Sequence, residues 1–216
     1  MKKINSSYQA FIILFFSAFI LYGCMSVPDS PTPRFYMLRA VTADAVSQKF
    51  SFPAHIIIGL GPVKIPGYIN RPQIVTLGKD KTLNFAQFDR WGESLDLALE
   101  RVISEDLINL LPAGTVIEMF PWNLAVTVRY QIIVGIVKLE SQLDKDLSIT
   151  AQWSIIDQLK REVVLTKRSE IRRPIEPHNY YGLAETLSAA CASLSSEIAQ
   201  GLSSLDNNPA TNIQEK

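Results

Sequence analysis

The chain has 216 residues, and its 21 lysines and arginines balance its 21 aspartates and glutamates, so the formal net charge at pH 7 is zero. No stretch gathers the basic residues into a stripe that would neutralise phosphates, and this excludes nucleic acid as an expected partner. Hydrophobic residues make up 47% of the chain, and no internal repeat is visible. The composition therefore predicts one core of ordinary size.

The N-terminus begins with two positive charges followed by an apolar run. Lys2 and Lys3 precede residues 10–22, which contain no charged side chain. A transmembrane helix needs about 20 apolar residues, whereas a signal-peptide core needs roughly 7 to 15. Residues 1–23 are therefore predicted to be a signal peptide, and the chain is predicted to be exported.

The apolar run ends in Leu21, Tyr22, Gly23 and Cys24, which resemble the bacterial lipobox, where a signal peptidase cuts before a cysteine that then carries lipid. Tyr22 departs from the lipobox pattern, which usually has a small residue at this position. In the alternative interpretation, the N-terminal apolar segment stays uncleaved as an anchor and Cys24 is an ordinary thiol. In bacterial lipoproteins Met25, in place of an aspartate, implies passage to the outer membrane. We therefore expect a lipid-anchored protein on the periplasmic face of the outer membrane.

The chain contains only one other cysteine, Cys191. If Cys24 carries lipid, Cys191 has no partner for an internal disulfide. It is then expected to be a buried small hydrophobic residue rather than a redox or nucleophilic group.

Residues 24–34 are predicted to be a lipidated tether, because three of the eight residues from 27 to 34 are prolines. Short strands follow, since β-branched and aromatic residues are enriched between turn signals. These strands are expected at residues 35–41, 55–65, 71–77 and 83–88. The prolines and the sequence GKDK between the last two predict a hairpin turn or a sheet edge.

The hydrophobic period then changes, which predicts an amphipathic helix over residues 91–111. Its apolar residues recur at intervals of three and four: Trp91, Leu95, Ala98, Leu99, Val102, Ile103, Leu107 and Leu110. Asp89 or Ser94 is placed to cap its start, and Pro112 and Gly114 mark its end.

A short strand at 116–120 precedes the clearest strand pattern of the chain, at 124–136, where every second residue is apolar. We expect this strand to bend at Gly135. Two more strands follow after short turns, at 147–155 and 162–171. The three strands together predict an antiparallel meander.

A second amphipathic helix is predicted to open near Asn179. Its apolar stripe comprises Tyr180, Leu183, Ala184, Leu187, Ala190, Cys191, Leu194, Ile198 and Leu202. Residues 206–216 have little apolar content and are expected to form a flexible tail. The order of elements predicts a single α+β periplasmic domain over residues 35–205, with two long helices packed on one face of a mostly antiparallel sheet.

No catalytic constellation is visible in the sequence. The nearest approach to G-x-S-x-G, at residues 92–96, lacks the last glycine. His55 and His178 are far from any Cys, Asp or Glu spacing typical of zinc sites, and no P-loop motif occurs. We therefore expect a protein that is not an enzyme and holds neither metal nor cofactor.

Two segments, GPVKIPGYINRPQIVT at 61–76 and NFAQFDRWGESLDLALERVISEDL at 84–107, carry a family resemblance. With the lipobox and the strand beginning FYML, they resemble the PqiC family, the outer-membrane lipoproteins of the paraquat-inducible system, also called ABC-type transport auxiliary lipoproteins. The matching positions are Gly61, Pro62, Val63, Pro66, Tyr68, Arg71, Pro72, Gln73, Ile74, Val75, Arg90, Trp91 and Leu95. Gly92 departs from the family pattern, because a residue that favours a helix more strongly is expected there.

The resemblance implies a non-catalytic periplasmic adaptor that docks an MCE-type tunnel protein, so that lipid passes between the two membranes without crossing water. Partner contacts are expected at Tyr68, Arg71, Pro72, Arg90 and Trp91, because Tyr and Arg are enriched at interface hot spots. In the alternative interpretation, the prolines only shape loops and Trp91 anchors its helix in the core.

The second functional hypothesis is a structural or assembly lipoprotein that stabilises an envelope complex without handling lipid. Under either hypothesis, small residues on the outer face of the final helix permit close approach of a neighbour. These residues are Ser188, Ala189, Ala192, Ser195 and Ser196. With the resemblance to a multimeric adaptor, they predict a homo-oligomeric ring.

Overall fold

The computed structural model describes residues 31–45, 49–53, 55–123 and 125–206. Contacts group Pro33–Lys216 into one compact unit, separate from Met1–Thr32. The predicted signal peptide, Cys24 and the predicted tail after residue 206 lie outside the described residues.

Five strands form the larger sheet, in the order β5-β2-β6-β7-β8. Their bounds are β2 (Ile57–Lys64), β5 (Val116–Met119), β6 (Tyr130–Ser141), β7 (Asp146–Asp157) and β8 (Glu162–Pro174). The antiparallel pairing of β6, β7 and β8 confirms the predicted meander. Strand β2 instead runs parallel to both β5 and β6. Parallel neighbours need a long crossover, and the connection from β2 to β5 supplies one because it contains the first long helix.

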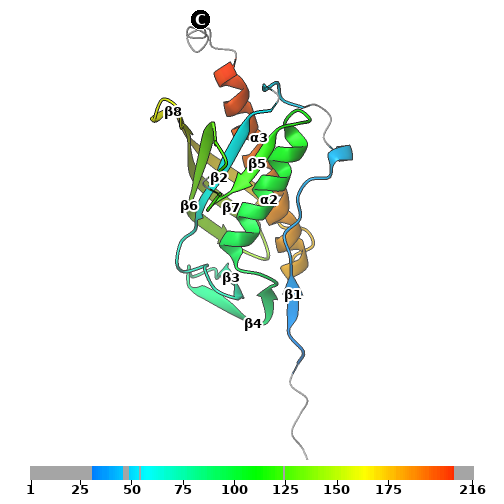
Figure 1. Cartoon of the computed structure of the whole chain (residues 1–216). Coiled ribbons are helices and arrows are strands. Elements are labelled where there is room, and N and C mark those ends of the chain that lie inside the picture. The colour runs from blue at the N-terminus through cyan, green and yellow to red at the C-terminus, as the bar shows by residue number, and fades with distance from the viewer. Residues whose placement is uncertain (1–30, 46–48, 54, 124, 207–216) are drawn as a thin grey trace, which may run out of the picture. The chain divides into compact units, whose positions relative to one another are not determined.

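Three strands form a separate, smaller sheet in the order β1-β4-β3. They are β1 (Arg34–Tyr36), β3 (Gln73–Leu77) and β4 (Leu83–Trp91). The turn between β3 and β4 closes through hydrogen bonds from Gly78 N to Thr82 O (2.8 Å) and from Lys81 N to Gly78 O (3.0 Å), which confirms the predicted hairpin. The small sheet lies at one end of the domain, below the larger sheet in the view of Figure 1.

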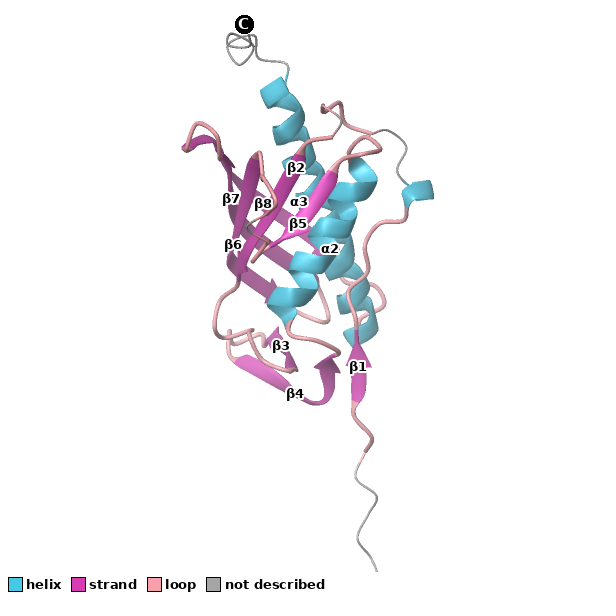
Figure 2. Cartoon of the chain, in the orientation of Figure 1, coloured by secondary structure: helices cyan, strands magenta, loops and turns pink. Residues whose placement is uncertain are grey.

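Two long helices, α2 (Leu95–Leu110) and α3 (Tyr180–Asp206), cover one face of the larger sheet (Figure 2). Helix α2 packs on β2 and β5, while α3 packs on β7 and β8. The predicted stripe of α3 is buried from Leu183 to Leu202, since these side chains meet the sheet. Asn179 caps α3, because its Oδ1 accepts a hydrogen bond of 2.9 Å from Gly182 N. The α+β fold with two helices on one sheet face is thereby confirmed.

The chain after β1 runs as an extended segment along the helices and does not continue as a strand. Leu38 is buried there, and Val41 N donates a hydrogen bond of 2.7 Å to Asp106 Oδ1 of α2. The segment ends in a short 3-10 helix, η1 (Ala43–Ala45). The strand predicted over 35–41 is therefore too long. Side chains of the two helices bind the backbone N–H groups of this segment, which would otherwise form hydrogen bonds with a neighbouring strand.

The first helix begins later than predicted, at Leu95, because Trp91 belongs to β4. Trp91 N donates a hydrogen bond of 2.8 Å to Pro72 O, and Gly92 N donates one of 2.7 Å to Tyr36 O. Ser94 is the N-terminal flanking residue, but its side chain makes no capping bond and donates to Asp96 Oδ1 instead.

Strand β6 begins at Tyr130, so the prediction of a strand from residue 124 is wrong at its start. Asn123 directs a turn there, accepting hydrogen bonds of 2.9 Å from Val126 N through its backbone and from Ala125 N through its side chain. The irregularity expected at Gly135 lies close by, between Ile136 and Lys138.

Candidate docking surfaces

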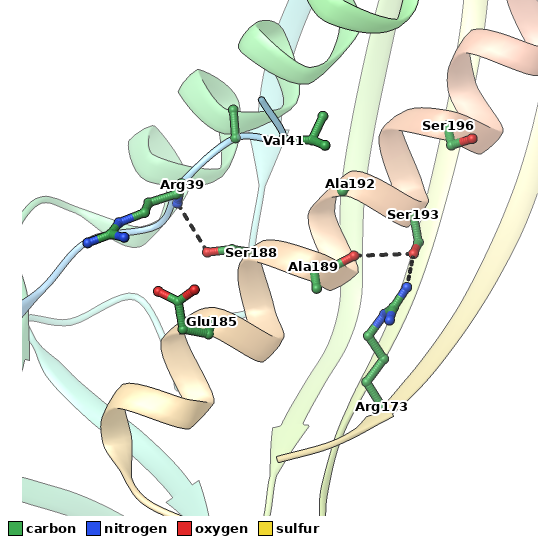
Figure 3. Close-up of a pocket in the computed structure, with 10 residues that line it drawn as sticks. Arg39, Val41, Arg173, Glu185, Ser188, Ala189, Ala192, Ser193 and Ser196 are labelled. Atoms are coloured by element: carbon green, nitrogen blue, oxygen red, sulfur yellow. Dashed lines mark hydrogen bonds between the residues drawn. The ribbon is translucent and has the colours of Figure 1, made fainter. Parts of the chain in front are cut away.

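An open groove of about 660 Å³ runs along the outer side of α3. Its walls come from the extended segment at Arg39 to Val41 and from Arg173 of β8 (Figure 3). Ala189, Ala192, Ser193 and Ser196 supply small side chains along the helix. Small residues let another backbone approach closely, so the groove suits an extended or helical segment of a protein partner.

The groove carries two arginines and one carboxylate. Arg173 Nη2 donates a hydrogen bond of 2.7 Å to Ser193 Oγ, while Arg39 and Glu185 stand on the opposite side (Figure 3). Ser193 Oγ in turn donates to Ala189 O at 3.2 Å. These polar contacts occupy the hydroxyl, and the groove offers a partner mainly shape and small apolar surface.

Two of the small residues expected on this outer face are buried instead. Ser188 Oγ donates to Ala184 O at 2.8 Å and accepts a hydrogen bond of 3.1 Å from Arg39 N. Ser195 is fully buried, and its hydroxyl donates to Asp106 Oδ2 at 3.1 Å. The placement of Ser188 and Ser195 on the outer face was wrong, because the extended segment and α2 cover this side of the helix.

Asp106 lies at the centre of the contact between α2, α3 and the extended segment. Burial raises its pKa to about 6, although the hydrogen bonds from Val41 N and Ser195 Oγ favour the charged form. Val41 N and Ser195 Oγ both donate, so this position requires a hydrogen-bond acceptor, which the Asp106 carboxyl group supplies. Asp106 is therefore a structural junction beneath the groove wall rather than part of an open site.

Tyr68 and Trp91, two of the expected contact residues, have structural roles. Tyr68 is half-buried, and its hydroxyl donates to Leu139 O at 2.9 Å and accepts from Leu139 N at 3.1 Å. Trp91 is buried in the core, which agrees with the alternative interpretation of this residue. The sequence alone could not distinguish a contact residue from a structural one here, because Tyr68 and its partner Leu139 are 71 positions apart in the chain.

The other three expected contact residues lie on the small sheet. Arg71 and Pro72 are exposed, and the Arg71 guanidinium stands 4.4 Å from the ring centroid of Phe85. Arg90 is half-buried, and its Nε has no hydrogen-bond partner among the described residues. The structure thus places Arg71 against an exposed aromatic ring, while Arg90 pairs with Phe35 and Gln73 of the neighbouring strands.

Two exposed aromatic residues of the small sheet, Phe35 and Phe85, were not singled out from the sequence. We call the surface made by Phe35, Leu83, Phe85, Arg71 and Arg90 the small-sheet face. The alternation in LNFAQF pointed to a strand, but only the pairing of β4 with β1 and β3 shows which side remains open.

The buried titratable groups show no catalytic arrangement within the described part of the chain. Burial raises the pKa of Glu100 and, together with the nearby Asp106 charge, that of the Cys191 thiol, so each is shifted toward its neutral form. His178 Nδ1 lies 3.1 Å from Leu143 O. Among the described residues, no group of three His, Cys, Asp or Glu side chains is placed to hold a metal ion. The described helices include none that is both long and apolar enough to span a membrane.

The fold and its surfaces define an α+β domain that presents a groove and an apolar sheet face. The chain belongs to the family of ABC-type transport auxiliary lipoprotein components, whose model matches residues 36–199. This family is described as an auxiliary component of transport and not as a class of enzyme.

Two solved structures share the fold. One, an uncharacterized protein, has a TM-score of 0.65 at 17% identity, with 80% of this chain and 99% of that chain covered. Protein XCC0632 from Xanthomonas campestris has a TM-score of 0.65 at 12% identity, with 81% and 98% covered. A search of the curated proteins found no match.

Proposed function

We propose that the protein is an outer-membrane lipoprotein of the periplasmic face that serves as a non-catalytic adaptor of an MCE-type intermembrane lipid transport system. The observation that carries the proposal is the match of the transport auxiliary lipoprotein family to residues 36–199, which include both helices up to Ala199 and all strands except the first residues of β1.

Cys24 carries the anchor in this proposal. The lipobox places it after the signal peptide, and nine residues separate it from Arg34 at the start of β1. Such a linker spans at most about 3.3–3.6 Å per residue, so the domain stays within a few tens of ångströms of the membrane. Met25 directs the lipoprotein to the outer membrane.

The groove along α3 is the proposed contact between copies of the chain. Ala189, Ala192 and Ser196 line it and permit close approach, while Arg39 and Arg173 on its walls can meet carboxylates of a neighbour. A repeated contact of this kind closes into a ring when the rotation per subunit divides a full turn. A ring stacked on an MCE-domain tunnel protein would extend the path of the lipid toward the outer membrane.

A photo-reactive amino acid tests the proposal in intact cells. It is placed at Ala189 in the groove, at Arg71 on the small sheet, or at Leu159 on the β7–β8 hairpin, and crosslinked partners are identified by mass spectrometry. Capture of an MCE-domain protein from any position supports the adaptor, and capture of a second copy from Ala189 supports the ring. Capture only of a barrel or cell-wall component would favour the structural or assembly lipoprotein instead.

A further inference from the structure

The exposed apolar side chains of the small sheet lie on its neighbouring strands β1 and β4. Arg90 of β4 pairs with Phe35 of β1 and with Gln73 of β3, and Val75, two residues after Gln73, pairs with Phe85. Directly paired residues of neighbouring strands point to the same face of a sheet, as do residues two apart in one strand. Phe35 and Arg90 therefore share a face, while the register of β3 and β4 shifts between the pairs of Gln73 and Val75. Phe35 and Phe85 lie on the neighbouring strands β1 and β4, and their side chains are 64% and 49% exposed.

Leu83 adds a third exposed apolar side chain to this small-sheet face. It pairs with Leu77 in the same hairpin, two residues before Phe85. The face thus presents two aromatic rings and an aliphatic side chain. Side chains of this kind enter the interface between lipid headgroups and acyl chains, whereas the edge of a soluble sheet is usually polar.

The charges beside these side chains are positive. The Arg71 guanidinium covers the Phe85 ring, and the Nε of Arg90 has no partner among the described residues. The nearest carboxylate in β4, Asp89, is occupied, because it accepts hydrogen bonds from Arg34 Nε (2.8 Å) and Tyr36 Oη (2.7 Å). Arg71, which is exposed, is therefore the arginine placed to bind phosphate groups, which suit the fork of guanidinium donors, whereas Arg90 Nε is buried.

The turn of the β3–β4 hairpin adds two lysines. Lys79 forms an exposed ion pair of 3.2 Å with Asp144, and Asp80 accepts hydrogen bonds from Thr82 at 2.6 and 3.1 Å. Lys81 adjoins them without an ion pair among the described residues. Asp80 and Asp144 balance Lys79 and Lys81, so the turn adds no net positive charge to the small-sheet face.

The place of the face in the chain indicates which surface it meets. Strand β1 belongs to the small sheet, and only nine residues join it to Cys24. The β7–β8 hairpin lies at the other end of the domain (Figure 1). A lipid on Cys24 therefore tethers the domain through β1, so the small sheet is the sheet joined to the anchor by the shortest stretch of chain.

We propose that the small-sheet face rests on the phospholipid headgroups of the membrane that holds the anchor. Phe35, Leu83 and Phe85 enter the interface, and Arg71 binds lipid phosphate. The contact orients the domain, so that the groove on α3 and the far hairpin are turned toward protein partners. The inference rests on the lipid anchor of the proposed function, and not on the identity of the transport partner.

The test uses the mature full-length lipoprotein in vesicles of phosphatidylethanolamine and phosphatidylglycerol. An environment-sensitive NBD fluorophore is attached in Phe85→Cys or, as a matched control, in Leu159→Cys on the far hairpin, where the native side chain is 66% exposed. The native thiol of Cys191 is buried and does not compete for the label. Vesicles that contain doxyl-labelled lipid should quench the label at position 85 several-fold more than the label at position 159.

Arg71→Gln, added to Phe85→Cys, should reduce this quenching. Flotation of the vesicles is measured in parallel. Protein that floats but shows no quenching, or equal quenching at both positions, would overturn the proposal and leave the lipoprotein assignment intact. Loss of quenching on addition of purified MCE-domain protein would show that the tunnel protein occupies this face, and would also overturn it. Failure to float would remove the anchor itself, and both proposals with it.

Discussion

Asp106 of α2 accepts a hydrogen bond from Ser195 Oγ of α3 across a distance of 3.1 Å, and both residues are fully buried. The other carboxylate oxygen of Asp106 accepts one from Val41 N at 2.7 Å. One side chain thus joins both helices to the extended segment that leads back to β1. The orientation of the helices and the path of the N-terminal segment are therefore coupled at one carboxylate.

Stability should fall as the pH rises through the titration of Asp106. Its folded-state pKa is about 6 and its ordinary value is 3.8, so between these values the folded state binds more protons than the unfolded state. The free energy of unfolding then decreases from about pH 4 to pH 6, by up to about 3 kcal/mol, and this contribution stays constant above that range. Urea unfolding at several pH values measures it.

The isosteric change Asp106→Asn should remove this pH dependence and raise the stability at pH 7.5 relative to the native chain. An amide still accepts from Val41 N and donates to Ser195 Oγ. The control Asp106→Ala should lower stability by about 1–3 kcal/mol, because it leaves two buried donors unpaired. An unchanged pH profile in Asp106→Asn would show that another group titrates in this range.

Gly201→Ala should destabilise the protein although Gly201 lies within a helix. Alanine favours a helix by about 1 kcal/mol over glycine. However, a Cβ at this position would lie 2.7 Å from Trp153 Cη2 and 2.9 Å from Leu165 Cδ2. Trp153 cannot move aside easily, since its Nε1 donates a hydrogen bond of 2.9 Å to Ser169 Oγ. Overpacking costs about 1–3 kcal/mol, so we expect a net loss.

The matched control for that substitution is Gly67→Ala, where an added Cβ meets nothing within 4 Å. Its stability should differ from that of the native chain by less than about 0.5 kcal/mol. Thermal unfolding of the two variants side by side measures the difference. Equal or greater stability of Gly201→Ala would mean that the contact between α3 and Trp153 is looser than the distances indicate.

The elements that the sequence predicts best are those whose signal is local. The stripe containing Leu187 and Leu194 follows the helical period because one helix face meets the sheet along its whole length. The β6–β8 meander was recognised for the same reason, since its strands are consecutive and alternate in polarity. The fold class could therefore be derived from the order and length of these patterns.

What the sequence did not show depends on pairs that are far apart in the chain. Ser195 looked like a solvent-facing small residue, yet it binds Asp106, and Arg34 pairs with Asp89 across 55 positions. The division into two sheets and the parallel pairing of β2 belong to the same class. Phe35 and Phe85 were overlooked because the small sheet that carries them forms only after β1, β3 and β4 have paired.

Cys24→Ser should release the protein from the outer membrane, either as soluble chain or as uncleaved precursor. A lipid chain contributes about 0.8 kcal/mol per buried CH₂ to membrane binding, and the substitution removes it. Density-gradient fractionation of cell envelopes measures the change. The control Cys191→Ala alters the buried thiol and should leave the fractionation unchanged. Continued outer-membrane fractionation of Cys24→Ser would contradict the lipid anchor.

Leu99→Asp and Leu187→Asp should each prevent stable folding. Both leucines are buried in the helix faces against the sheet, so an aspartate there would be an unpaired charge in the core. The expected cost, at least about 4 kcal/mol, is a large part of the total stability of an ordinary domain. The exposed Leu97, on the same helix as Leu99, provides the control Leu97→Asp. Circular dichroism melting should show a native transition only for the control.

Tyr68→Phe should destabilise the domain by about 1–2 kcal/mol, because the hydroxyl serves Leu139 as both donor and acceptor. The two hydrogen bonds fasten the loop after β2 to β6, beside the irregularity in that strand. The control is Tyr181→Phe, since the Tyr181 side chain is exposed and should lose almost nothing. Urea unfolding gives the stabilities, and crosslinking from Ala189 in cells gives partner capture. A structural role predicts lower stability for Tyr68→Phe, with capture retained while the protein stays folded. Native stability combined with loss of the MCE-domain partner would instead make Tyr68 a contact residue.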